Sequence, residues 1–342
     1  MTLLSDFDYA LPQELIAQTP AAERDRSRLL HLSPEGIRHH TFRDLPGLFQ
    51  PGDLLILNDT RVFPARLEGV RAGGGRSELL LLERLDSDRV RVLARPARKL
   101  RKGAQLSFGG GKLEAEVLEV EEDGKRIVGF RFEGDWDALL EELGTTPLPP
   151  YIESSDDEPT TRLRYQTIYA RPKGSIAAPT AGLHFTEAMF EALRERGVEV
   201  AFVTLHVGHA TFQTIREGEI EAHRMGVERY VVPEETKEKI RGAGRRVVAV
   251  GTTTVRALES AALAGFPRSW QETDLFITPG FEFRVVSGLL TNFHLPKSAL
   301  LILVSAFGGR ERVLEAYREA VKERYRFYSF GDAMLLHPAG VR

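Results

Sequence analysis

The residues between positions 67 and 146 alternate apolar and polar side chains, and this pattern restricts the fold more than any other feature of the chain. Short segments with this alternation are separated by glycine-rich or acidic turns: SELLLLERL, RVRVLAR, AQLSF, LEAEVLEV and RIVGFRFE. A period of two with such turns is typical of antiparallel β-structure. The sequence therefore predicts a small barrel or sandwich of about six strands in this segment.

Two runs of three glycines lie in this segment, at positions 73–75 and 109–111. Neither run belongs to a strand–GxGxxG–helix frame, which is the arrangement that holds a dinucleotide phosphate. We therefore interpret both runs as hairpin turns rather than as phosphate-binding loops.

On either side of this segment, the sequence pattern alternates between predicted strands and helices, as in an α/β protein. Before it stand a short helix candidate, PQELIAQ, and two strand candidates, RLLHLS at 28–33 and DLLILND at 53–59. After a proline-rich connector at 147–152, helical and strand patterns alternate, beginning with a helix capped by Thr186 and closed by Gly197. Further candidates are the strand VEVAFVTLHVG, a helix near 234, a strand–turn–helix unit at 247–265, two more strands, and the amphipathic helix ERVLEAYREAVKERY.

This change of sequence pattern, from short alternating β-segments to mixed helices and strands, predicts two domains. Residues 1–66 and 147–342 would form an α/β domain with a mixed sheet and helices, and residues 67–146 would form an inserted antiparallel β-barrel domain.

The stretch TNFHLPKSALLILVSAFGG at 291–309 joins a polar half to an apolar half. The apolar half is too short to cross a bilayer, which takes about 20 residues, so it predicts a buried helix that ends at Gly308–Gly309. Ser298 can cap this helix, and Lys297 adds a positive charge beside the positive end of its dipole. The stretch therefore predicts a rigid helix start that can bind an anion, with His294 beside it.

The chain contains no cysteine, which limits the chemistry it can perform. Disulfides, thiolate nucleophiles, cysteine-ligated zinc and iron–sulfur clusters are excluded. No apolar run is long enough to span a membrane, and the first residues carry acids without a basic region, so we expect no signal peptide. We therefore expect a cytoplasmic protein that uses oxygen and nitrogen groups.

Charge is distributed unevenly along the chain, although the net charge is only −3. The segment from Arg89 to Lys102, which we name the basic run, has seven basic residues and no acid, and the segment from Glu114 to Asp123 has six acids and no base. The basic run can form a positive face for a polyanion. Alternatively, the two segments are solvated strand faces that pair electrostatically across a hairpin.

Three histidines stand in the same local frame, each directly after an apolar residue: His184 in GLHFT, His206 in TLHVG and His294 in TNFHLP. Ligands of open α/β sheets bind at the carboxyl ends of strands, where these segments are predicted to lie. A single histidine of this kind is more often structural, but three of them favour a shared pocket. Three histidines can bind zinc, yet no HExxH pairing is present, so we expect no metal.

Other polar residues also follow predicted strands. The turn GTTTVR at 251–256 is interpreted either as an anion or ribose site at a helix start or as an ordinary threonine cap. The candidate substrate-binding residues of this turn and of the first strand-end loop are Gly251, Thr252, Thr253, Thr254, Arg256, Asn58, Asp59 and Arg61. Asp332, between a glycine and an apolar run, is a candidate acid or ligand group.

Long segments of the chain closely resemble the S-adenosylmethionine:tRNA ribosyltransferase-isomerase family of queuosine biosynthesis. The resemblance runs from end to end and rests on FDYALPQELIAQTP with RSRLL, GDLLILNDTRVFPARL, RYQTIYA, GSIAAPTAGLHFT, TLHVG with ATF, GTTTVRALE, TNFHLPKSALLILVSAF and YRFYSFGDAML. It implies an α/β domain with an inserted β-barrel. The chain departs from the family pattern at His209 and Ala210, and at Gly226, where the family has a second histidine.

The resemblance also implies a reaction. The ribosyl carbons of S-adenosylmethionine are transferred to a tRNA whose wobble base is 7-aminomethyl-7-deazaguanine, and they rearrange to an epoxycyclopentane. Adenine and methionine leave, and the product is epoxyqueuosine-tRNA. S-adenosylmethionine is then a co-substrate, and no metal, permanently bound cofactor, membrane or obligate protein partner is implied.

The chemistry of this reaction assigns tasks to residues. A base must remove a proton from the 5′ carbon, and His184, His206 and His294 are the candidates, with Asp332 as a further catalytic candidate. Thr180, Asn292, Lys297 and Ser298 join the expected substrate-binding residues. For tRNA binding we expect the basic run: Arg89, Arg91, Arg95, Arg98, Lys99, Arg101 and Lys102.

Two other classes of protein remain as alternatives. A non-catalytic tRNA-binding module would be expected to show an aromatic-rich RNA-binding motif, which the chain lacks. A methyltransferase, another S-adenosylmethionine-dependent tRNA-modifying transferase or a dehydrogenase is the second alternative. The classical members of that class would show a GxGxxG turn followed by an acid in a βαβ unit, and this pattern is also missing.

Overall fold

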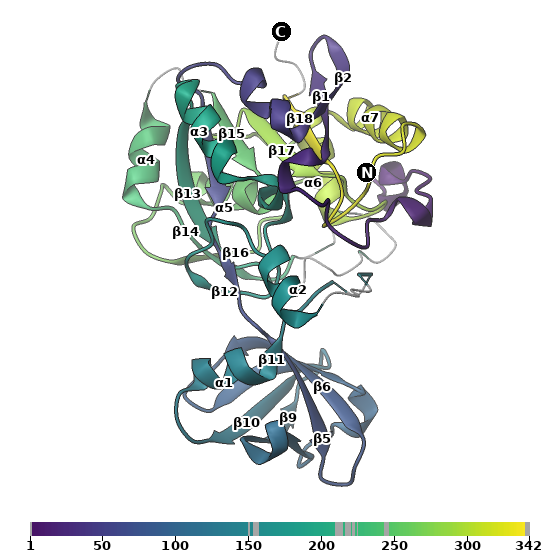
Figure 1. Ribbon diagram of the computed structural model, residues 1–342, viewed down its shortest axis with the longest axis vertical. Helices are drawn as coiled ribbons and strands as arrows, with labels where there is room; N and C mark the ends of the chain where they lie inside the picture. Colours follow the sequence, from purple (N-terminus) through teal and green to yellow (C-terminus); the bar gives the residue numbers. More distant parts are fainter. Residues whose placement is uncertain are drawn as a thin grey trace.

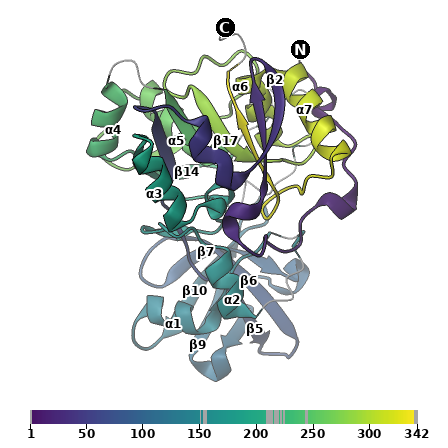
Figure 2. The same cartoon turned by 45° about the horizontal axis from the view of Figure 1, so that its top comes forward.

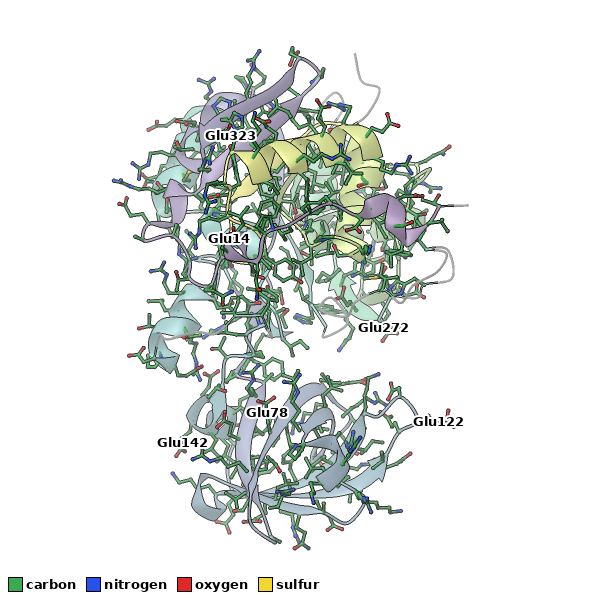
Figure 3. All side chains as sticks on the ribbon, turned by 90° about the vertical axis from the view of Figure 1, so that its right-hand side faces the viewer. Glu14, Glu78, Glu122, Glu142, Glu272 and Glu323 are labelled. Atoms are coloured by element: carbon green, nitrogen blue, oxygen red, sulfur yellow. The ribbon has the colours of Figure 1, made fainter. Side chains whose placement is uncertain are left out.

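The computed structural model describes residues 2–149, 151–152, 157–208, 215, 220, 223, 225–242 and 246–338. It has a larger lobe, which contains the strands β1 and β18, and a smaller barrel-shaped lobe (Figure 1). A view from the side shows the same division, with Glu14 and Glu323 on the larger lobe and Glu78 and Glu142 on the barrel (Figure 3).

A nine-stranded mixed sheet runs through the larger lobe, in the order β16-β14-β13-β3-β15-β17-β18-β1-β2. Its strands are β1 (Arg28–Ser33), β2 (Gly36–Thr41), β3 (Leu54–Asn58), β13 (Glu199–Leu205), β14 (Glu228–Val231), β15 (Val247–Val250), β16 (Gln271–Thr273), β17 (Gly288–Asn292) and β18 (Ala333–Leu336). The four neighbours β13, β3, β15 and β17 are parallel. Every residue of β3, β15 and β17 is buried, as expected of parallel strands covered on both faces.

Alternate residues of the sheet face two separate cores. Leu54 and Ile56 pack in one core with the helices α5 (Thr252–Leu263), α6 (Ala299–Gly308) and α7 (Arg310–Lys322). Leu55 and Leu57 pack in the other core with α3 (Glu187–Glu195) and the 3₁₀ helix η4 (Phe42–Leu48). The period-two pattern of strands thus places helices on both faces of the sheet (Figures 1 and 2).

Shorter helical segments complete the larger lobe. They are η1 (Leu4–Phe7), η2 (Gln13–Leu15), η3 (Arg24–Arg26), α2 (Glu158–Arg164), η7 (Thr180–His184) and α4 (Glu234–Arg241). The expected helix PQELIAQ is only the single turn η2, because the chain extends after Leu15 and Ile16 pairs with Phe327. None of the helices in the described ranges is long and apolar enough to cross a bilayer.

The predicted helix boundaries at 186–197 and 298–309 are confirmed. The hydroxyl of Thr186 accepts a hydrogen bond from Met189 N, and Gly197 adopts a positive φ of 74° after α3. Ser298 in the same way accepts from Leu301 N at 3.2 Å and begins α6, which is buried along most of its length. Gly309, with φ of 82°, separates α6 from α7.

The smaller lobe is a closed antiparallel barrel. Its strands are β5 (Arg66–Arg71), β6 (Arg76–Arg84), β7 (Arg89–Arg95), β8 (Gln105–Phe108), β9 (Leu113–Val120) and β10 (Arg126–Phe132), and β11 (Gly144–Thr145) pairs with the start of β5. The order is β5-β6-β7-β10-β9-β8, and a pairing of β8 with β5 closes the barrel. The fold class predicted from the sequence, an α/β lobe with an inserted small barrel, is therefore confirmed.

The glycine runs of the barrel lie where hairpin turns were predicted. Residues 73–75 connect β5 with β6, and the 3₁₀ turn η6 (Gly109–Gly111) connects β8 with β9. The helix α1 (Trp136–Leu143) was not predicted from the sequence. Its Trp136 and Leu140 pack into the barrel core, so this helix closes one end of the barrel.

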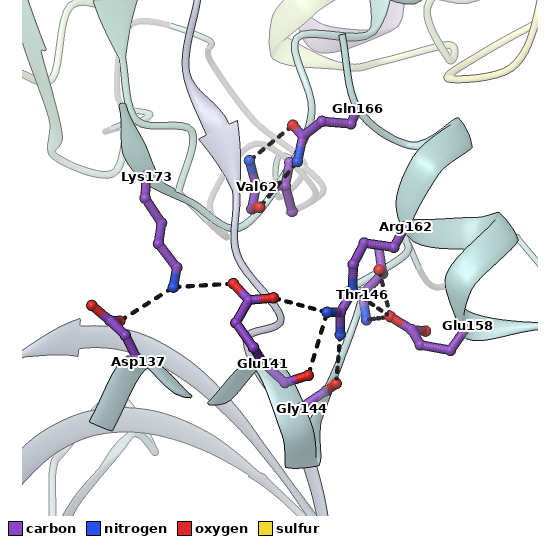
Figure 4. A network of polar contacts seen from close by, with 9 residues as sticks. All are labelled: Val62, Asp137, Glu141, Gly144, Thr146, Glu158, Arg162, Gln166 and Lys173. Atoms are coloured by element: carbon purple, nitrogen blue, oxygen red, sulfur yellow. Dashed lines mark hydrogen bonds and ion pairs between the residues drawn. The ribbon is translucent and has the colours of Figure 1, made fainter. Parts of the chain in front are cut away.

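A network of polar contacts joins α1 to the larger lobe (Figure 4). Lys173, in the short strand β12 (Lys173–Ser175) that pairs with β4 (Arg61–Val62), binds Asp137 at 3.3 Å and Glu141 at 3.1 Å. Arg162 binds the other side of Glu141 at 2.8 Å. These partly exposed pairs contribute at most about 1 kcal/mol each, so they orient the barrel more than they stabilise it. The domain boundaries at 66/67 and 146/147 remain a prediction.

Candidate active site

A small pocket lies at the carboxyl ends of β15 and β17, and we name it the strand-end pocket. Its cavity volume is about 60 Å³. Polar lining residues that the sequence had singled out come from three places: Gly251, Thr252 and Thr253 at the start of α5, Thr291, Asn292 and His294 at the end of β17, and Thr180 in η7. Open α/β sheets bind ligands at this edge.

Gly251 determines how α5 enters the pocket. Its φ of 86° and ψ of 151° are reached without strain only by glycine, and its N–H donates to Leu290 O at 2.7 Å. Within the described part of the chain, no side chain at the capping position binds the first N–H groups of α5, so the start of this helix faces the pocket with its partial positive charge. The threonine-cap interpretation of this turn is thus wrong for the described structure, because the capping position is occupied by Gly251.

The threonines that follow Gly251 differ in direction. Thr252 and Thr253 line the pocket, whereas the hydroxyl of Thr254 donates back to Val250 O at 2.6 Å and is fully buried. Two of the three predicted hydroxyls therefore face the pocket, although Thr253 Oγ1 already accepts a hydrogen bond from Asn58 Nδ2 at 3.3 Å.

Asn292 is held from both ends of its amide group. Its Oδ1 accepts a hydrogen bond from Thr180 Oγ1 at 3.1 Å. Its Nδ2 donates to Asp332 O at 3.4 Å and lies 3.2 Å from His184 Nε2. Because the carbonyl of Asp332 requires a donor, these contacts assign the amide orientation and make His184 Nε2 an acceptor.

His184 is a neutral and fully engaged imidazole. Since Nε2 accepts from Asn292, Nδ1 carries the proton and donates it to Ser27 Oγ at 2.7 Å. Burial, in part against the ring of Phe42, lowers the pKa of His184 to about 4. His184 does not line the strand-end pocket, so the structure gives it the geometry of a residue that positions Asn292.

His294 is the histidine that lines the strand-end pocket. Its Nε2 lies 2.9 Å from Thr291 Oγ1, and its backbone is fixed by the hydroxyls of Tyr9 and Tyr317. Among the described residues, the one side-chain hydrogen bond found for its ring is that of Nε2. Burial lowers the pKa of His294 to about 3, which keeps the ring neutral near pH 7 but makes it a weaker base than a free imidazole.

His206 lies apart from both other histidines. Its Nδ1 is 2.8 Å from Thr60 Oγ1, and its ring stacks on Trp270 with centroids 4.9 Å apart. Burial, and then the charge of Arg229, lowers the pKa of His206 to about 4. The structure therefore places the three predicted histidines in three different surroundings, and only His294 reaches the pocket.

The loop after β3 holds the start of α5, which lines the pocket, in place through hydrogen bonds of Asn58. Asn58 accepts hydrogen bonds from Thr60 N and Leu205 N, and its Nδ2 donates to Leu205 O at 2.9 Å and to Thr253 Oγ1 at 3.3 Å. These bonds fix the start of α5 relative to β3 and β13.

The two other candidates in this loop do not line the pocket. Asp59 accepts from Thr204 Oγ1 at 2.6 Å, and burial raises the pKa of its carboxyl. Arg61 is exposed on β4.

Two predicted cations have partners away from the pocket. Lys297 forms an ion pair with Asp8 at 2.9 Å and is about half exposed. Arg256 is buried in an ion pair with Glu228 and donates to Leu275 O at 3.0 Å.

Ser298 and Asp332 also have structural contacts. Ser298 caps α6 and donates to Leu295 O at 2.7 Å. The carboxylate of Asp332 accepts from Arg28 N at 2.8 Å and from Arg326 N at 2.7 Å, and burial raises its pKa. Each of these groups therefore holds chain segments together at or near the site.

Sequence reasoning did not single out three residues that also line the pocket: Tyr165, Tyr328 and Ser329. The hydroxyl of Tyr165 is buried without a hydrogen-bond partner among the described residues. Tyr328 has a positive φ of 77°, while its N–H donates to Phe293 O at 3.0 Å. The segments RYQTIYA and YRFYSFGDAML, which carried part of the family resemblance, contain all three and were the available signal.

The side chains of the basic run divide into two groups. Arg89 pairs with Asp86, and Arg91 pairs with Glu83 and Glu121, so electrostatic pairing within the barrel accounts for these two. The remaining five are exposed, and no ion pair is found for them among the described residues: Arg95, Arg98, Lys99, Arg101 and Lys102. Buried Arg126 donates to Ala97 O at 2.8 Å and Leu100 O at 3.2 Å, which fixes the backbone that carries them.

No group of three or more histidine or acidic side chains in the described ranges is arranged to hold a metal ion. His209 and Ala210 lie outside the described residues, and Gly226 lies in an irregular segment before β14.

Known proteins similar to this chain agree on one family. A family model described as queuosine biosynthesis protein matches residues 4–336. S-adenosylmethionine:tRNA ribosyltransferase-isomerase of Carboxydothermus hydrogenoformans is 53% identical over 339 residues, covering 97% of this chain and 99% of that protein. The enzyme of the same name from Moorella thermoacetica is 52% identical over 344 residues, with the same coverage. The crystal structure of S-adenosylmethionine tRNA ribosyltransferase from Thermotoga maritima is 43% identical, has a TM-score of 0.53, and covers 97% of this chain and 99% of that one.

Proposed function

Because this chain belongs to the queuosine biosynthesis protein family, we propose that it acts as an S-adenosylmethionine:tRNA ribosyltransferase-isomerase. The resemblance read from the sequence is thereby confirmed. The enzyme transfers the ribosyl moiety of S-adenosylmethionine to the 7-aminomethyl group of 7-deazaguanine at the tRNA wobble position and isomerises it. Epoxyqueuosine-tRNA, adenine and methionine are the products. The observation that carries this proposal is the match of 53% identity over 97% of the chain.

The strand-end pocket is the proposed site for S-adenosylmethionine. The uncapped start of α5 and the hydroxyls of Thr252 and Thr253 suit carboxylate or ribose oxygens. Arg256, Lys297 and Ser298 are weaker candidates for contacts to S-adenosylmethionine, because each already has a partner in the protein. Small-molecule sites usually measure about 300–1,000 Å³, so a cavity of about 60 Å³ holds only part of the substrate.

His294 is the proposed base. The reaction requires removal of a proton from the 5′ carbon, which the neighbouring sulfonium acidifies. His294 lines the pocket and is neutral, and the hydrogen bond found for its ring among the described residues involves Nε2 and not Nδ1. General base candidates are judged first by such geometry and then by their pKa. His184 and Asp332 then act on the reaction through Asn292 and the surrounding backbone.

The five unpaired cations of the basic run are the proposed contacts to tRNA phosphates. Their charge is not neutralised within the described part of the protein, and Arg126 holds their backbone in place. A tRNA-modifying enzyme of this kind works where tRNA is found, so we keep the cytoplasm as the proposed location.

A direct test of the function is incubation with S-adenosylmethionine and tRNA that carries 7-aminomethyl-7-deazaguanine, followed by chromatography of the small products. We expect free adenine and methionine, and a modified tRNA. Release of S-adenosylhomocysteine instead would identify a methyltransferase. Stable tRNA binding without any small product would identify a binding module.

A further inference from the structure

Two arginines, Arg24 and Arg164, line a hollow next to the strand-end pocket. A third, Arg326, acts on His184 in the same lining, and we name the three residues the arginine cluster. Arg24 and Arg164 line the hollow together with His184 and Ser329. Arg326 is close enough to affect the pKa of His184. Ser329 also lines the strand-end pocket, so the two depressions are neighbours.

Backbone carbonyl groups hold the guanidinium groups in place. Arg24 donates from Nη1 to Leu183 O and from Nη2 to Leu163 O, both at 3.0 Å. Arg164 donates to Ala21 O, and Arg326 donates to Thr19 O. Carbonyl oxygens orient a guanidinium without neutralising it, so the positive charges of the cluster remain.

The nearby acids are occupied elsewhere. Glu23 and Asp25, the chain neighbours of Arg24, bind Arg43, and Glu23 also binds Arg26. Asp332 lies close to Arg326, and its negative charge offsets part of the charge of Arg326, although its carboxylate oxygens accept backbone N–H groups and form no direct bond to the guanidinium. No ion pair to a carboxylate is found for any member of the cluster among the described residues.

Burial and mutual repulsion of these positive charges are unfavourable for the free energy of folding, and an anionic ligand can offset this cost. Burial, and then the charge of Arg164, lowers the pKa of Arg24. Positive groups that are pre-oriented close together without a counter-charge are the arrangement by which arginine recognises phosphate. The hollow has a volume of about 20 Å³, enough for a water or one phosphate oxygen, so a ligand must lie across its mouth.

We infer that the arginine cluster binds a phosphodiester of the RNA substrate, next to the nucleotide that enters the strand-end pocket. This inference rests on the proposed function. The other available anion is the carboxylate of S-adenosylmethionine, but that molecule also carries a sulfonium and an ammonium group and is positive overall. The cluster would repel it, whereas the RNA backbone is attracted.

The position of the cluster connects RNA binding with the pocket. Arg24 binds the carbonyl of Leu183, and the next residue, His184, binds Asn292 in the pocket. A phosphate seated on Arg24 is thus linked to Asn292 through the turn η7 and a single side chain.

The test compares R24Q and R164Q with R26Q. Arg26 belongs to the same 3₁₀ turn as Arg24, but it is exposed and pairs with Glu23, so it is a matched control. The dissociation constant for tRNA carrying 7-aminomethyl-7-deazaguanine is measured over a range of salt concentrations, together with the KM for S-adenosylmethionine. Thermal unfolding checks that each variant is folded.

For R24Q and R164Q we expect about tenfold weaker tRNA binding and a salt slope lower by about one, with an unchanged KM for S-adenosylmethionine. R24K keeps the positive charge and should therefore show the salt slope of the wild type. If Arg24 only held the backbone in place, R24Q would leave the salt slope unchanged. R164Q carries the test if R24Q is unstable.

Two results would overturn the inference. Unchanged tRNA affinity and salt slope in both variants would exclude the phosphate contact, and a higher KM for S-adenosylmethionine alone would assign the cluster to the carboxylate. If the wild-type protein releases no adenine from the two substrates, the proposed function itself fails.

Discussion

Asn292 organises the pocket at the scale of single residues. Its partners Thr180 and His184 are 112 and 108 positions away in the sequence, and both come from η7. The arrangement works only while His184 is neutral, because a protonated ring cannot accept from the amide.

The pH dependence of stability should reveal this requirement. Burial depresses the pKa of His184 from 6.5 to about 4, so the unfolded chain binds the proton more readily than the folded protein. The contribution of neutral His184 to the free energy of unfolding is therefore complete above about pH 6.5 and is lost as the pH falls towards about 4. Between pH 7 and pH 5, wild type should lose about 2 kcal/mol more free energy of unfolding than H184Q in urea titrations. Equal losses would show that the pKa of His184 is the same in the folded and the unfolded protein.

Replacement of His294 tests the proposed base. H294Q keeps the size and polarity of the side chain but cannot accept the proton, so adenine release should fall about a hundredfold or more. H40Q, which changes a histidine on β2 outside the pocket, should keep normal turnover. If H294Q is active and H206Q is not, the base is His206 instead.

At the scale of secondary structure, the start of α5 is the element that shapes the ligand end of the pocket. Gly251 turns the chain out of β15 directly into the helix, and Asn58 fixes Thr253 from the neighbouring strand. The helix then presents free N–H groups to the cavity.

The substitution G251A should disturb this element through the backbone. A Cβ atom has space, since its nearest neighbours would be 3.7 Å away, but φ of 86° is strained for alanine. We expect a loss of about 1–3 kcal/mol in the free energy of unfolding and a higher KM for S-adenosylmethionine. G265A, beyond the other end of α5 with φ of 73° and open space, is the control. It should cost about 1–2 kcal/mol and leave the KM unchanged. If the KM for S-adenosylmethionine rose equally in both variants, the increase would not come from the shape of the pocket.

At the scale of the whole molecule, two positive surfaces serve one polyanion in our proposal. The basic run lies on the barrel, and the arginine cluster lies on the larger lobe beside the pocket. The network around Lys173, Glu141 and Arg162 fixes the two lobes relative to each other (Figure 4).

Charge reversal in the basic run tests the barrel surface. The variant R98E/K99E should weaken tRNA binding and lower its salt slope by about one for each phosphate that the barrel no longer binds, without changing the KM for S-adenosylmethionine. R318E/K322E on α7 changes the net charge equally and is the control. If both variants behave alike, the effect comes from net charge, and the tRNA surface lies elsewhere.

The sequence alone determined the two-part architecture of this protein, because local patterns carry that information. Alternation with period two predicted the barrel strands, and Thr186 and Ser298 predicted the starts of α3 and α6 from capping chemistry that acts within one turn. The same long segments identified the family. β2 was missed because GIRHHT has a single apolar residue and no clear alternation. α1 was missed although its sequence carries a local signal, namely the cap Asp135, a run of strong helix formers and Gly144 at the end.

Only the tertiary structure decided which polar residues meet. Three histidines in one local frame looked equivalent, yet contacts from Ser27, Thr60 and Thr291 give them three different surroundings. The arginine cluster likewise joins positions 24, 164 and 326, which no local pattern connects. Side-chain direction and burial arise when distant segments pack together, so the duties of individual residues depend on the fold and not on their spacing in the chain.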